Sequence, residues 1–103
     1  MELTITRNAE NADVTLIGSF TFNDNPKFKT ILELTEDGTV KSINCNFARV
    51  DFVDSAALGM LMMLRAAAAN KNQSVSLSDV KGQVEKIFKL SKFDTMFHVH
   101  YSK

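Results

Sequence analysis

The sequence of 103 residues has little cysteine, proline or glycine. Its one cysteine, Cys45, cannot form an internal disulfide, which suits a reducing compartment. The only proline is Pro26, and the four glycines do not form a loop that could cradle a phosphate. No linker, repeat or low-complexity segment divides the chain. We therefore expect one intracellular domain over residues 1–103.

Excess charge and long hydrophobic runs are absent too. Twelve basic residues balance twelve acidic ones, and no basic patch appears, which argues against nucleic acid or a membrane surface as the partner. Residues 1–7 lack the layout of a signal peptide. The longest weakly polar run, residues 56–69, is too short to span a bilayer and contains Arg65. The expected location is the cytoplasm.

What the chain does contain is an ordinary globular composition, 45% hydrophobic and 23% charged. Alternating residues predict strands, and the 3.6-residue period predicts helices. A helix is expected to begin with Asn25 as its cap and Pro26 as its first position, and another to begin with Ser78 and Asp79 as caps. Strands are predicted at 3–5, 14–18, 40–47 and 75–77, with a last extended segment at 97–101. Helices are predicted from Pro26 to the stop at Gly38, at 55–70 and at 80–91.

This order of elements predicts an α/β fold with a mixed sheet of about four to five strands. Ile43, Cys45 and Phe47 alternate with Asn44 and Asn46, so one sheet face should be dry and the other wet. The helices are therefore expected mainly on one side of the sheet.

The segment around Ser55 carries the functional signal. It joins a strand to the predicted helix 55–70, where unpaired N–H groups and the positive end of the helix dipole lie. The Ser55 hydroxyl can cap that helix, or it can accept a phosphoryl group.

The helix itself shows two contrasting sides. Ala57, Leu61, Leu64 and Ala68, with Met60 beside them, form a stripe that should face the sheet. The opposite side holds no carboxylate and no lysine, which indicates a contact surface for another protein; its residues are Ser55, Gly59, Met62, Met63, Ala66 and Asn70. The alternative is that Met62 and Met63 fill gaps in the core. Gly59, one turn after Ser55, leaves space for close approach to the serine.

The run Phe52-Val53-Asp54-Ser55-Ala56-Ala57-Leu58-Gly59 resembles the Asp-Ser-x-x-Leu-Gly signature of STAS domains. Gly18 with Phe20, the segment 75–88 and the segment 91–97 are similar to further family segments in the same order. The resemblance covers essentially the whole chain and implies a mixed sheet with helices on one face.

The resemblance also implies a function, that of a single-domain anti-sigma factor antagonist. In such proteins the serine after the aspartate is phosphorylated, which corresponds to Ser55. The unphosphorylated domain binds an anti-sigma factor or another regulator with a serine-kinase fold, phosphorylation releases it, and a PP2C-type phosphatase resets it. This implies a bacterial, non-enzymatic regulator without a cofactor or metal. Its partner-binding residues would be Asp54, Ser55, Gly59, Met62 and Met63.

Two departures from the family pattern accompany this reading. Thr21, followed by Asp24, stands where many antagonists have an acidic residue that contacts the partner. Ala56 and Ala57 stand where a small polar residue and then a glycine often follow the serine. In this respect the sequence is more similar to the stand-alone forms of Gram-negative partner-switching systems. The alternative function is a STAS subunit of a membrane transport complex that has no phosphorylation cycle.

Other candidate sites are weaker. His98 and His100 share a strand face but lack further metal donors. Cys45 has no catalytic histidine pattern, so it is expected to be a buried small hydrophobe. Asp51 and Asp54 resemble an aspartyl-phosphate site without the additional acidic and lysine residues that such a site needs.

Overall fold

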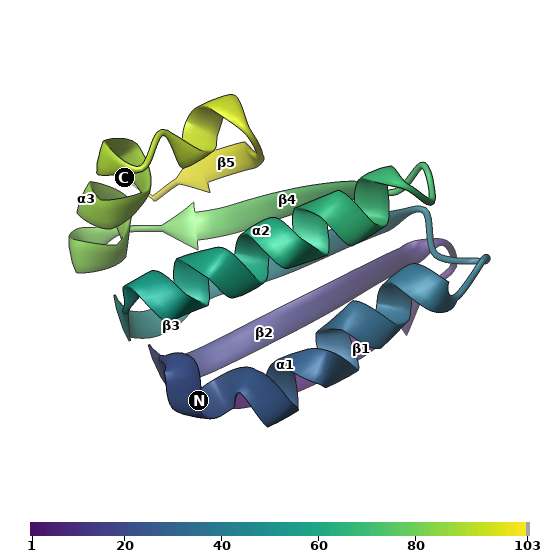
Figure 1. The fold of residues 1–103 in the computed structure, drawn as a ribbon, viewed down its shortest axis with the longest axis horizontal. Helices are drawn as coiled ribbons and strands as arrows, with labels where there is room; N and C mark the ends of the chain where they lie inside the picture. Colours follow the sequence, from purple (N-terminus) through teal and green to yellow (C-terminus); the bar gives the residue numbers. More distant parts are fainter. Residues whose placement is uncertain (103) are drawn as a thin grey trace.

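The computed structural model, which describes residues 1–102, contains five strands and three α-helices in a two-layer α/β arrangement (Figure 1). The strands are β1 (Glu2–Asn8), β2 (Asn11–Phe20), β3 (Ser42–Val53), β4 (Ser74–Val80) and β5 (His98–Tyr101). The helices are α1 (Asn25–Leu32), α2 (Ser55–Ala69) and α3 (Gly82–Leu90). Short 3₁₀ turns lie at η1 (Phe22–Asp24), η2 (Glu33–Glu36) and η3 (Phe93–Thr95).

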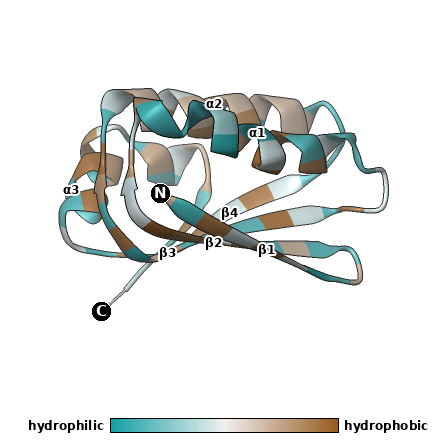
Figure 2. Ribbon diagram, turned by 90° about the horizontal axis from the view of Figure 1, so that it is seen from below, coloured by the Kyte–Doolittle hydropathy of each residue, from teal (hydrophilic) through white to brown (hydrophobic). Residues whose placement is uncertain are grey.

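The strand order explains why the helices lie on one side. The sheet runs β1-β2-β3-β4-β5; β1 is antiparallel to β2, and the other neighbours are parallel. Each crossover between neighbouring parallel strands moves in the same direction across the sheet. Because such crossovers are right-handed, all three helices cover the same face, as Figure 2 shows. The predicted fold class is confirmed.

The core lies between this helical layer and the sheet. Ile43, Cys45 and Phe47 are fully buried, as the alternation predicts. At the β5 end, Phe88 of α3 packs edge-on against Phe47 with ring centres 5.3 Å apart and stacks on Phe93 at 4.9 Å. These aromatic contacts hold α3 and η3 onto the sheet.

The uncovered sheet face is polar, and its side chains bond to one another. Asn44 of β3 accepts a hydrogen bond from the Ser76 hydroxyl at 2.8 Å and donates to the Ser78 hydroxyl at 3.1 Å. Asn46 donates to Asp79 at 2.9 Å. The polar ladder, as we call Asn44, Asn46, Ser76, Ser78 and Asp79, thus satisfies much of its own hydrogen-bonding capacity.

The predicted end of the third strand was wrong. β3 continues beyond Phe47 to Val53, and its later inward residues are Val50 and Val53, at a spacing of three rather than two. The cause is a pair of register shifts against β2, one of them next to Gly18, whose φ is +94°. Such bulges interrupt the alternation from which the strand was predicted.

The predicted starts of two helices also need correction. Asn25 is the first residue of α1, and Asp24 stands in the cap position. Ser78 and Asp79 do not cap α3, because they belong to β4 and bond to β3 through the polar ladder. α3 begins only at Gly82, and Val80 pairs with Tyr101 in the sheet.

The aromatic cluster gives a stability prediction. Phe88→Ala should lower the free energy of unfolding by about 3–5 kcal/mol, since it empties a fully buried site. Leu90→Ala, on the same helix but 84% exposed, is the matched control and should change it by less than about 0.5 kcal/mol. Urea denaturation followed by circular dichroism measures both; equal effects would contradict this description of the core.

Candidate functional site

Asp54 organises the start of α2. It stands in the N-cap position with an extended backbone, and its Oδ1 accepts a hydrogen bond from the Ala57 N–H at 2.8 Å. Its other oxygen, Oδ2, accepts from the Phe22 N–H at 3.1 Å. One carboxylate therefore caps the helix and fixes the η1 turn beside it.

Ser55 is the first residue of α2 and not its cap, so of the two alternatives for its hydroxyl, the one in which it caps the helix is wrong. The side chain is exposed, and within residues 1–102 its hydroxyl makes no hydrogen bond. Asp54 already satisfies the amide that a serine cap would have reached. The Ser55 hydroxyl therefore lies exposed beside helix N–H groups, a position that favours a nearby anion.

The exposed side of α2 is almost free of charge. The Ser55 face, as we call Ser55, Gly59, Met62, Met63 and Ala66, lies opposite the buried stripe. Met62 is 46% exposed and Met63 58%, so the alternative that they fill the core is wrong. The one charged residue of α2, Arg65, donates from Nε to the Met96 carbonyl at 2.7 Å, next to β5.

Gly59 leaves the middle of this face open. A Cβ added there would meet no heavy atom within 4 Å, once the helix's own nearby backbone is set aside. Packing inside the chain therefore does not require glycine at this position. Glycine within a helix lowers stability by about 1 kcal/mol relative to alanine, so its presence here is not explained by the fold. The space over Gly59 is accessible from outside.

Thr21 stands directly before the η1 turn and Asp24 ends it, and the two residues bond to each other. Asp24 is only 5% exposed, and its Oδ2 accepts from the Thr21 N–H at 2.8 Å. Burial raises the pKa of Asp24, but the Thr21 amide and the nearby Met1 ammonium outweigh it, so the pKa lies below its usual value. Asp24 shapes the turn, and Thr21 is half-buried.

Phe22 is the site residue that the sequence did not reveal. It is 65% exposed, and its N–H bonds to Asp54, so it stands beside the start of α2. Continued alternation would have placed Phe22 inward with Phe20. The turn that begins after Thr21 directs it outward instead.

The weaker candidates lie elsewhere. His98 and His100 are exposed on β5, and no group of three metal-donor side chains is assembled within residues 1–102. Asp51 accepts from the Ser19 hydroxyl at 3.2 Å. Burial raises the pKa of the Cys45 thiol to about 12, as expected for a core residue. Across the described part of the chain, no helix is both long and apolar enough to cross a membrane.

Comparison with known families identifies one match over nearly the whole chain. Residues 3–99 match the sequence model of the family described as "Mlab, STAS domain". A STAS-domain containing protein of Pseudomonas aeruginosa (strain UCBPP-PA14) is 29% identical over 101 residues, which cover 96% of this chain and 99% of that protein.

Solved structures share the fold at low sequence identity. An anti-sigma-factor antagonist (STAS) domain protein from Planctomyces limnophilus has a TM-score of 0.83 at 12% identity, over 98% of this chain and 90% of that one. The Bacillus cell fate determinant SpoIIAA in its phosphorylated form has a TM-score of 0.77 at 16% identity, over 99% and 92%. The resemblance noted in the sequence is confirmed at the level of family and fold.

The capping geometry predicts unequal roles for two neighbouring residues. Asp54→Ala should lower the free energy of unfolding by about 1–2 kcal/mol, because both the cap and the tie to Phe22 are lost. Ser55→Ala should change it by less than about 0.5 kcal/mol. Thermal and urea melts of both variants test this. A larger loss in Ser55→Ala would make the serine the true cap.

Proposed function

Because this chain belongs to the STAS domain family, we propose that it is a non-enzymatic regulator whose binding to a protein partner is switched by phosphorylation of Ser55. The partner is an anti-sigma factor or another regulator with a serine-kinase fold, which binds while Ser55 is unmodified. A PP2C-type phosphatase removes the phosphate and restores binding. The cycle takes place in the cytoplasm.

The observation that carries this proposal is the free, exposed hydroxyl of Ser55 at the edge of an uncharged surface. Phe22, Met62 and Met63 are large exposed apolar side chains on or beside this surface. Methionine and aromatic side chains are well suited to protein contacts. A kinase can reach Ser55 without unfolding the domain.

The sign of the switch follows from electrostatics. A phosphoserine adds a charge of about −1.5 to −2 at pH 7. In a bound complex that charge would lie next to the Asp54 carboxylate and among apolar side chains, where it meets like-charge repulsion and a desolvation penalty. The N–H groups at the start of α2 stabilise the phosphate in the free domain, where water also reaches it. Phosphorylation therefore favours release.

The switch predicts opposite binding by two Ser55 variants. Ser55→Ala should keep the affinity of the unmodified protein, and Ser55→Asp should bind about tenfold or more weakly, since a carboxylate imitates part of the phosphate charge. The partner is first captured from the native cell with Ser55→Ala as bait and is then titrated calorimetrically against both variants.

Equal affinities, or tighter binding by Ser55→Asp, would contradict the proposed mechanism. A Ser55-independent complex with subunits of a membrane transporter would instead favour the alternative, a STAS subunit of a transport complex. Melting curves of both variants ensure that binding and not folding is compared.

The Ser55 face predicts a second effect on binding. Met62→Lys and Met63→Lys should each weaken the complex about tenfold, since each buries a charge in an apolar contact. The melting temperature should stay nearly unchanged, because both positions are exposed. Thr4→Lys, on an exposed position of β1, is the control and should bind normally. Normal binding by both methionine variants would place the contact elsewhere.

A further inference from the structure

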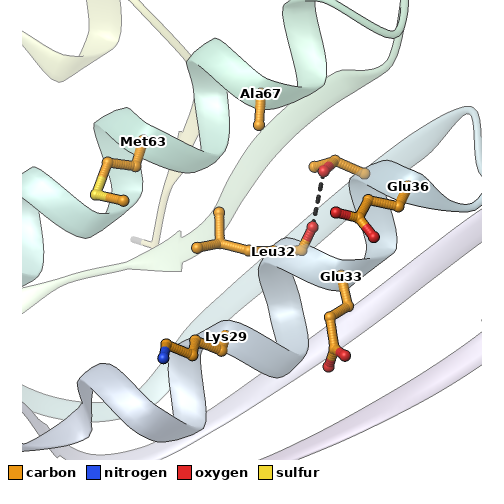
Figure 3. A pocket seen from close by; sticks show the side chains of 7 residues that line it. Lys29, Leu32, Glu33, Glu36, Met63 and Ala67 are labelled. Atoms are coloured by element: carbon orange, nitrogen blue, oxygen red, sulfur yellow. Dashed lines mark hydrogen bonds between the residues drawn. The ribbon is translucent and has the colours of Figure 1, made fainter.

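A groove of about 630 Å³ opens between α1 with its η2 extension and the second half of α2. Leu32, Met63 and Ala67 supply its apolar part, and Lys29, Glu33 and Glu36 supply its charged rim. Figure 3 shows Leu32 and Ala67 directed into the space between the two helices, with the Glu36 carboxylate turned toward it. We call this the α1–α2 groove.

The charges of this groove come from one wall only. Glu33 and Glu36 are exposed, and neither forms an ion pair within residues 1–102. Lys29 precedes Glu33 by one helical turn without pairing with it. The α2 wall contributes no charge, because Arg65 is directed to the Met96 carbonyl near β5. The rim therefore has two free carboxylates against one ammonium group.

The groove is continuous with the Ser55 face. Met63 belongs to both, and its side chain is 58% exposed. A partner that covers Met62, Gly59 and Ser55 reaches the groove by extending over the adjacent turn of α2. The groove thus lies within the footprint of one partner rather than on a separate surface.

We propose that the α1–α2 groove binds a segment of the same partner in which an aliphatic or methionine side chain is flanked by arginine or lysine. This inference rests on the proposed function, because it assigns a chemistry to the partner of the Ser55 face. The apolar side chain fills the space between Leu32, Met63 and Ala67, and the basic side chains pair with Glu33 and Glu36.

Charge complementarity selects this occupant over others. A partner that covers the rim desolvates two carboxylates, and this is costly unless each receives a cation. An acidic segment would meet repulsion on the same rim. Arginine matches a carboxylate with two parallel hydrogen bonds, so it is the preferred flanking residue.

Photo-crosslinking tests which segment lies in the groove. A benzoylphenylalanine is placed at Lys29, on the rim, at Met62, on the Ser55 face, or at Thr4, on β1, each in the Ser55→Ala chain. After illumination in an extract of the native cell, the linked peptides are sequenced by mass spectrometry. Position 29 should link to a segment with an apolar residue flanked by Arg or Lys, position 62 to the same protein, and position 4 to neither.

Titration of that linked segment as a synthetic peptide gives the quantitative test. The double variant Glu33→Lys, Glu36→Lys should bind it about tenfold more weakly than the unmodified chain, and the difference should shrink at high salt. Glu2→Lys with Glu10→Lys makes the same charge change at exposed positions away from the groove and should leave the affinity unchanged.

The outcomes separate this inference from the proposed function. An acidic or uncharged segment at position 29, or no effect of the charge reversal, overturns the assignment of the groove while the Ser55 switch stands. Links from position 62 without any from position 29 do the same. If none of the three positions links to a protein, both the groove assignment and the proposed function are wrong.

Discussion

The Asp54 carboxylate makes the pair of hydrogen bonds on which the candidate site depends. One oxygen holds the Ala57 N–H at 2.8 Å, and the other holds the Phe22 N–H at 3.1 Å. The first bond starts α2 at Ser55, and the second keeps the η1 turn against that start. Phe22 therefore lies on the same surface as the Ser55 face. The cause is that the Asp54 side chain bonds to the amides of Phe22 and Ala57, which are 35 residues apart in sequence.

Much of the fold could be predicted from local patterns. The alternation of Ile43, Cys45 and Phe47 with asparagines reports a sheet with one dry face, and the stripe from Ala57 to Ala68 reports the buried side of α2. Both patterns reflect burial, because inward-facing side chains recur every two residues in a strand and every 3.6 residues in a helix. The same stripe defined the opposite side of α2, where Met62 and Met63 are indeed exposed.

Much of what could not be predicted depends on contacts between distant segments. The bulges opposite Gly18 shift the register of β3, so inward residues no longer alternate. The local pattern predicts Asp79 as a helix cap, but Asp79 accepts a hydrogen bond from Asn46 across the sheet. At the site, Asp54 and not Ser55 caps α2, and the η1 turn directs the Phe22 side chain outward. The shifted register of β3 and the Asp79–Asn46 bond join segments more than 30 residues apart, which a local pattern cannot report. The Asp54 cap is local, but two adjacent residues that can both cap a helix leave the choice open.

The polar ladder on the uncovered face bears on which proteins can bind the domain at the same time. Its asparagine and serine side chains already serve as one another's partners, so the ladder offers another protein little unmet hydrogen bonding. Under the proposed function, a kinase, a phosphatase and the bound regulator would all need the Ser55 end of α2, so they would occupy the domain in turn. The abundance of each competitor would then matter as much as its affinity.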